Sequence, residues 1–111
     1  MEIIVSRQGK TTIVEPNGKI DLVGSGILGG RLADAATDEP LLLVIDLQRV
    51  NYITSAGFRV LLIAAKQATA KDFKLILCSL NEELRHLFQV AGFLHLFRVY
   101  ASREESLAAT A

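Results

Sequence analysis

The sequence predicts an α/β domain, in which a mixed β-sheet of four to five strands packs against about four helices. The run "LLLVIDL" (41–47) is apolar on both faces, which is typical of a central strand covered on both sides. Segments with helical spacing flank this run, and strands that alternate with helices indicate a partly parallel sheet. The 111 residues suit one domain, 1–111, with a core over about 3–108, and half of them are hydrophobic.

The N-terminal part predicts a β-hairpin, which makes the sheet mixed. Residues 2–7 and 10–15 have strand character, and the turn signals "RQG" and "PNG" follow them. A third piece around 19–23 is expected to continue the second strand after a turn or bulge at Pro16–Gly18.

Two helices are predicted in the middle of the chain. Residues 25–37 place Leu28 and Leu32 at helical spacing, although their three glycines each cost about 1 kcal/mol relative to alanine. Residues 55–72 form the second helix. Its expected inward stripe is Phe58, Leu61, Leu62 and Ala65, and Arg59, Ile63, Lys66 and Gln67 lie on another face.

The C-terminal part predicts two strands and two helices. Residues 73–80 and 96–101 form the strands. Ser79 and Glu82 are spaced as a capping box for a helix that stops at Gly92, and Ser102 with Glu105 can cap a final helix. The inward stripe of the helix before Gly92 is Leu84, Leu87, Phe88 and Ala91.

Composition excludes several classes of protein. Lys plus Arg and Asp plus Glu each number 12, and without a basic run we expect no nucleic-acid partner. The single Cys78 excludes a disulfide within the chain and argues against a zinc site, so it is expected in the core. Because no long apolar run is present, we expect a cytoplasmic protein without membrane insertion.

An enzyme is the competing hypothesis. "GSGILG" (24–29) matches the G-x-G-x-x-G pattern of dinucleotide sites, with Asp46 downstream as a candidate ribose-binding acid, but the preceding "KIDLV" carries a charge where such strands are apolar. Ser55, Asp46 and either His86 or His95 could form a hydrolytic triad, but no G-x-S-x-G elbow surrounds the serine. Asp21 and Asp46 each end an apolar stretch, where they can bind a ligand or accept hydrogen bonds in a turn or cap.

The stretch "NYITSAGF" (51–58) links a strand to a helix. Thr54 or Ser55 is expected to cap the helix that starts at 56. A hydroxyl there is also exposed at the positive end of a helix dipole, where free N–H groups tolerate a phosphate. Phosphorylation would add nearly two negative charges, which suits a binding switch.

These features resemble one family. "GKIDLVGSG", "VIDLQRVNYITSAGFRVLL" and "VAGFLHLFRVY" are similar to the STAS domain, and specifically to bacterial anti-sigma factor antagonists, over about residues 3–108. The resemblance implies a protein-binding module without enzymatic activity or a cofactor. Its partner would be an anti-sigma factor serine kinase with a histidine-kinase-like ATPase fold, which binds the unphosphorylated antagonist and releases it after phosphorylating one serine. A PP2C-type phosphatase would reverse the modification.

The resemblance also implies the site residues. The matching serine is Ser55, two residues before Gly57; the preceding residue, often Asp in the family, is Thr54, a possible second acceptor, and Ala56 stands where many relatives have a second Ser or Thr. Two alternatives stay open: a STAS regulatory subunit of a membrane transport system, and a small nucleotide-binding protein. The expected partner contacts are Asp21, Gly24, Ser25, Thr54, Ala56, Gly57, Arg59, Ile63 and Lys66.

Overall fold

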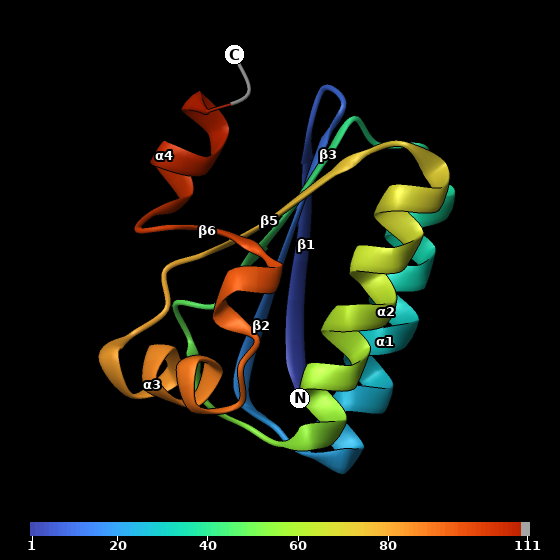
Figure 1. Cartoon of the computed structure of the whole chain (residues 1–111). Helices are drawn as coiled ribbons and strands as arrows, with labels where there is room; N and C mark the ends of the chain where they lie inside the picture. Colours follow the sequence, from blue (N-terminus) through green and yellow to red (C-terminus); the bar gives the residue numbers. More distant parts are fainter. Residues whose placement is uncertain (110–111) are drawn as a thin grey trace.

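A mixed sheet runs through the centre of the computed structural model, which describes residues 1–109 (Figure 1). In that part of the chain six strands pair in the order β1-β2-β3-β5-β6, and β4 pairs only with β2. β1 and β2 are antiparallel, whereas every other pair is parallel. The mixed α/β fold is confirmed, with one strand more than the four to five expected; residues 110 and 111 of the predicted domain lie outside the described residues. The strands are β1 (Glu2–Gln8), β2 (Thr11–Ile20), β3 (Leu42–Asp46), β4 (Val50–Ile53), β5 (Lys74–Cys78) and β6 (Arg98–Tyr100).

β2 is long enough to pair with two different parallel strands. Its first part pairs with β3, and its end pairs with the unexpected β4, where Ile20 lies opposite Ile53. Within the β2–β4 pairing the register shifts: Gly18 lies opposite Val50 and Lys19 opposite Tyr52, so Asn51 of β4 is the extra residue. Gly18 has a φ of +108°, which side-chain-bearing residues rarely adopt. Residues 19 and 20 therefore continue the second strand as expected, whereas the extra residue of the irregularity lies in β4 and not at Pro16–Gly18.

The helices divide unequally between the two faces of the sheet. α1 and α2 lie side by side on one face, and α4 lies on the other (Figure 1). α3 contacts β4. The bounds are α1 (Leu22–Thr37), α2 (Ser55–Lys71), α3 (Glu82–Val90) and α4 (Arg103–Ala108), with a short 3-10 helix η1 (Leu94–Leu96).

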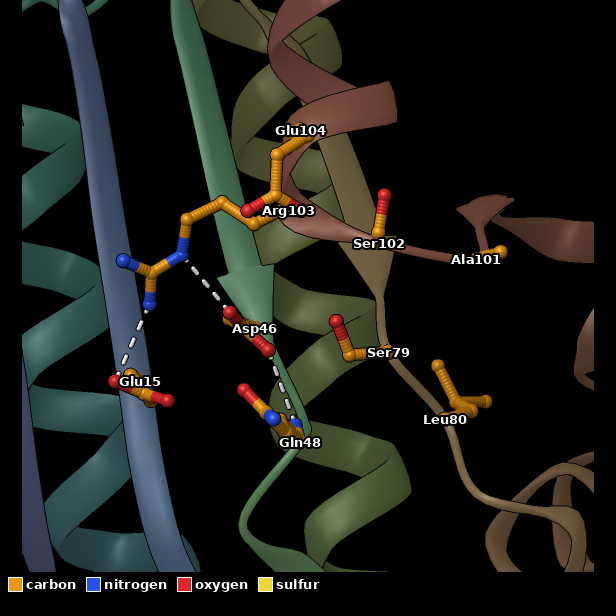
Figure 2. A pocket seen from close by; sticks show the side chains of 9 residues that line it. All are labelled: Glu15, Asp46, Gln48, Ser79, Leu80, Ala101, Ser102, Arg103 and Glu104. Atoms are coloured by element: carbon orange, nitrogen blue, oxygen red, sulfur yellow. Dashed lines mark hydrogen bonds and ion pairs between the residues drawn. The ribbon is translucent and has the colours of Figure 1, made fainter.

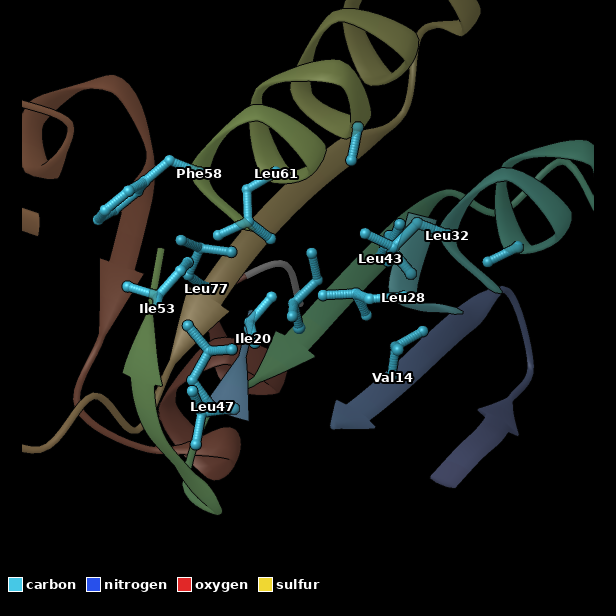
Figure 3. Close-up of a cluster of buried hydrophobic side chains, with 14 of the residues drawn as sticks. Val14, Ile20, Leu28, Leu32, Leu43, Leu47, Ile53, Phe58, Leu61 and Leu77 are labelled. Atoms are coloured by element: carbon cyan, nitrogen blue, oxygen red, sulfur yellow. The ribbon is translucent and has the colours of Figure 1, made fainter. Parts of the chain in front are cut away.

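The main hydrophobic core fills the space between the sheet and the helix pair α1–α2. Figure 3 shows Leu28 and Leu32 of α1 and Leu61 of α2 directed toward the strands. A smaller cluster lies on the opposite face, where Leu107 of α4 packs against it. Its buried members are Ile13, Leu42, Val44, Ile76 and Cys78, so the core position expected for the cysteine is confirmed.

Two helix starts differ from the predictions. α1 begins at Leu22 rather than at 25, because the Asp21 carboxylate accepts a hydrogen bond from the Gly24 N–H at 2.8 Å. α3 is capped by Asn81, whose side chain accepts from the Leu84 N–H at 2.7 Å. The capping box at Ser79 is therefore wrong. The cap at Ser102 is confirmed, since its hydroxyl accepts from the Glu105 N–H.

Not all residues of the hydrophobic stripes predicted for α2 and α3 are buried. In α2, Leu62 and Ala65 are only partly buried, because the helix turns smaller residues toward α1 and the sheet. In α3, Leu84 and Phe88 are buried, whereas Ala91 lies beyond the last turn and is exposed. The buried residues of α2 are Gly57, Phe58, Leu61, Ala64 and Ala68.

Gly57 sets how closely α2 approaches the sheet. A Cβ at this position would lie 2.6 Å from Ile53 Cγ1, 2.7 Å from Ile20 Cγ2 and 3.0 Å from the Ile20 carbonyl oxygen. Both isoleucines are buried, at 2% exposure or less. The first turn of α2 can therefore lie directly on the ends of β2 and β4 only because residue 57 has no side chain.

We predict opposite stability effects for alanine at two helical glycines. Gly57→Ala should lower the free energy of unfolding by about 1–3 kcal/mol, because the new methyl group overpacks the site. Gly30→Ala should raise it by roughly 1 kcal/mol, since a Cβ there meets nothing within 4 Å and alanine favours the helix. Urea unfolding of both variants measures this, and a Gly57→Ala protein as stable as the wild type contradicts the close approach described above.

Candidate functional site

The N-termini of α1 and α2 meet at the carboxyl ends of β2 and β4. The Ile20 carbonyl, at the end of β2, accepts hydrogen bonds from the Thr54 N–H at 3.0 Å and from the Thr54 hydroxyl at 3.1 Å. Asp21 follows Ile20 directly and caps α1. The structure therefore brings Asp21 close to Thr54 and Ser55, although 34 residues separate Ile20 from Thr54.

Ser55 is the first residue of α2, and its side chain is exposed. Within residues 1–109 its hydroxyl makes no hydrogen bond. Because the first N–H groups of a helix have no partner within the helix, they need a side chain, water or an anion. At α2 no side chain caps these groups, and the first turn contains no acidic residue. A phosphate on Ser55 would meet the positive end of the α2 dipole.

The prediction that a side chain caps the start of α2 is wrong. Thr54 occupies the N-cap position with an extended backbone, but its side chain makes no capping hydrogen bond. Its hydroxyl donates to the Ile20 carbonyl instead. The described starts of α1, α3 and α4 are all capped by side chains, so α2 differs from them in this respect.

The residues expected to contact a partner differ in how far they are buried. Gly24, Ser25 and Gly57 are buried, and the Ser25 hydroxyl donates to the Leu22 carbonyl within α1. The stretch 24–26 lies in the first turns of α1. Thr54 and Ala56 are partly buried, and the exposed members are Asp21, Ser55, Arg59, Ile63 and Lys66.

Exposed apolar side chains of α1 were not foreseen from the sequence. Leu22 is 77% exposed, Val23 73% and Ile27 40%, and all three belong to the first turns of the helix. Ile63 of α2 is 48% exposed and lines an apolar groove of about 230 Å³ between α1 and α2. The sequence pattern predicts Leu22 and Val23 at the end of a strand, whereas the structure places them in a solvent-facing turn of α1.

The enzyme hypotheses find little support in the geometry. The glycines of "GSGILG" lie inside α1 instead of forming a strand-to-helix loop, so the phosphate-binding turn of a dinucleotide site is not formed. His86 and His95 are exposed, and within the described residues neither bonds to Ser55 or Asp46. Among residues 1–109 no three His, Cys, Asp or Glu side chains form a group that could hold a metal ion. No described helix has the length and apolar character needed to cross a membrane.

The contacts of Asp46 give it a structural role. Its carboxylate is buried and accepts hydrogen bonds from the Gln48 N–H at 3.0 Å and from Arg103 Nε at 2.9 Å. The same guanidinium lies 3.2 Å from a Glu15 carboxylate oxygen (Figure 2). Partial burial lowers the pKa of Arg103, but Asp46 and Glu15 outweigh it and raise this pKa above its ordinary value. The residues that make these contacts line a polar cavity of about 580 Å³. Their contacts attach the start of α4 to β2 and β3.

Two curated proteins resemble this chain in sequence. The putative anti-sigma factor antagonist BtrV of Bordetella bronchiseptica is 46% identical over 67 residues, which cover 60% of this chain and 58% of that protein. The chain thus matches less than two thirds of the length of BtrV. The anti-sigma-F factor antagonist RsfB of Mycobacterium tuberculosis is 23% identical over 105 residues, covering 95% of this chain and 85% of RsfB.

Solved structures share the fold. An anti-sigma factor antagonist from Mycobacterium paratuberculosis superposes with a TM-score of 0.88 at 22% identity, over 97% of this chain and 92% of the other. Bacillus SpoIIAA in its phosphorylated form gives a TM-score of 0.75 at 16% identity, over 99% and 100% of the two chains. A sulfate transporter family protein from Wolinella succinogenes gives 0.82 at 22% identity, over 92% and 85%.

A family model completes the comparison. The model described as the STAS domain matches residues 2–106, which is nearly the whole chain. The match includes every strand and all of α1 and α2. The resemblance seen in the sequence is therefore confirmed, and the chain belongs to the STAS domain family.

Proposed function

We propose that this protein is an anti-sigma factor antagonist whose binding is switched by phosphorylation of Ser55. The observation that carries the proposal is the state of this serine, which is exposed, free of hydrogen bonds within residues 1–109, and placed at a helix N-terminus without a side-chain cap. The names of BtrV and RsfB support the same role.

The proposed partner is an anti-sigma factor serine kinase with a histidine-kinase-like ATPase fold. It binds the unphosphorylated antagonist, phosphorylates Ser55 and then dissociates, and a PP2C-type phosphatase restores the binding form. These partners place the protein in the cytoplasm. It acts as a binding module and not as an enzyme.

The proposed binding surface surrounds Ser55. Leu22, Val23 and Ile27 of α1 provide exposed apolar area next to the start of α2. A cluster of exposed apolar side chains is typical of a protein-binding site. Asp21, Arg59 and Lys66 supply charges at its border, and Ile63 extends the apolar area along α2.

Electrostatic exclusion explains the switch. A phosphoserine carries nearly two negative charges at neutral pH. The uncapped N–H groups of α2 stabilise these charges in the free protein. A partner that covers Leu22 and Val23 would have to remove water from the phosphate, and an unpaired buried charge is strongly unfavourable. Phosphorylation is therefore expected to weaken binding while the fold stays intact.

A regulatory subunit of a membrane transport system is the second candidate from the sequence, and the Wolinella succinogenes protein shares the fold. The two functions predict different binding partners. An antagonist binds a purified anti-sigma factor kinase in a manner that depends on residue 55, whereas a transporter subunit does not. The exposed and unbonded Ser55 favours the antagonist.

Substitutions at Ser55 test the proposed function. Ser55→Asp should weaken binding to the kinase by about 2–5 kcal/mol, or roughly 30-fold or more, because it places a charge in the interface. Ser55→Ala should bind as the wild type does and should stay bound in the presence of ATP. Titration calorimetry measures both affinities, and wild-type affinity for Ser55→Asp would rule out electrostatic exclusion.

Ile63→Ala tests the extent of the surface along α2. Since Ile63 is 48% exposed, its truncation should change the free energy of unfolding by only about 0.5 kcal/mol. Kinase affinity should fall about tenfold if the side chain is a central contact. Leu41→Ala is the matched control, because Leu41 is also exposed but lies beyond the C-terminal end of α1, directly before β3. Equal losses of affinity in the two variants would remove Ile63 from the proposed interface.

A further inference from the structure

Thr54 and Ser55 are adjacent hydroxyl residues in very different environments. The Thr54 side chain is partly buried, and its hydroxyl donates to the Ile20 carbonyl at 3.1 Å. The Thr54 N–H donates to the same oxygen at 3.0 Å. Two hydrogen bonds from one residue thus join the start of α2 to the end of β2. Ser55 has no side-chain hydrogen bond within the described residues and faces solvent.

Because of this difference, the Ser55 hydroxyl is a better phosphoryl acceptor than the Thr54 hydroxyl. To accept a phosphoryl group, Thr54 would have to give up its proton and its bond to Ile20. The phosphate oxygens would then lie against the Ile20 carbonyl, so that acceptor atoms would face one another without a donor between them. The Asp21 carboxylate follows Ile20 directly and adds a like charge nearby. Ser55 meets none of these obstacles.

The same two bonds fix the position of Ser55. They set the first residue of α2 against β2, two residues before Gly57, which lies against Ile20. Because the Thr54 side chain is directed toward Ile20, it does not cap the α2 N-terminus. The N–H groups of the first turn therefore remain available for a phosphate on Ser55.

We infer that Thr54 is a positioning residue that confines phosphorylation to Ser55 and presents this serine to the kinase. The inference rests on the proposed function. In the step, the Ser55 hydroxyl oxygen attacks the γ-phosphorus of a nucleoside triphosphate. The bond from this phosphorus to the β–γ bridging oxygen breaks, the nucleoside diphosphate leaves, and the serine proton passes to a base of the kinase.

Variants at the two positions test the inference in cells. The wild type, Thr54→Ser, Thr54→Val and Ser55→Ala chains are expressed in the organism that carries the gene, purified, and mapped by fragment mass spectrometry. We expect phosphate on Ser55 alone in the wild type and in Thr54→Ser, and none on Thr54 in Ser55→Ala. Thr54→Val removes the hydroxyl but keeps the branched shape, and it should reduce phosphate on Ser55 about tenfold, as expected for a misplaced reacting group.

The outcomes separate this inference from the proposed function. Phosphate on Thr54 in Ser55→Ala would overturn the confinement, and full phosphorylation of Ser55 in Thr54→Val would overturn the positioning, while the proposed switch would stand in both cases. A wild type without phosphate on either residue would overturn the proposed function and the inference with it. Melting temperatures of the Thr54 variants provide the control: recovery of phosphorylation in Thr54→Ser, at a melting temperature equal to that of Thr54→Val, excludes a purely structural effect.

Discussion

The close contact of Gly57 with Ile20 and Ile53 determines how the two halves of the site fit together. It allows α2 to start directly on the ends of β2 and β4, where a methyl group would lie within 2.7 Å of both isoleucine side chains. β4 pairs with the end of β2, where Ile53 lies opposite Ile20. The Ile20 carbonyl then holds Thr54, and Asp21 starts α1 one residue later. One crowded junction thus places both helix N-termini at a single surface and leaves Ser55 exposed.

The rest of the domain supports this junction from both faces of the sheet. On one face, Phe58 of α2 stacks on Phe93 and meets Phe88 of α3 edge to face, with ring centroids 4.8 Å and 4.9 Å apart. On the other face, Arg103 ties α4 to buried Asp46 and to Glu15. Removing one member of such a buried ion pair would leave an uncompensated charge. The polar cavity at Asp46 is therefore part of the scaffold, while the proposed phosphorylation site lies at the start of α2.

Sequence patterns predicted most elements, and the errors have physical causes. "LLLVIDL" identified β3 because all five residues of that strand are buried. β4 was missed since its four residues pair only with the end of β2, which no local pattern reveals. Ser55 came from the resemblance to a family, because nothing local distinguishes it from a capping residue. The role of Thr54 could not be predicted, since its hydroxyl bonds to a residue 34 positions away.

The central claim is that a charge on Ser55 controls binding without changing the fold. The most direct measurement compares the chain phosphorylated at Ser55 with the same sample after PP2C treatment, using titration calorimetry against the anti-sigma factor kinase and amide NMR spectra of the free protein. The account predicts that phosphorylation weakens binding about 30-fold or more, that dephosphorylation restores it, and that shifted amide signals are confined to the starts of α1 and α2. Equal affinities for the two forms, or signal shifts throughout the sheet, would contradict it.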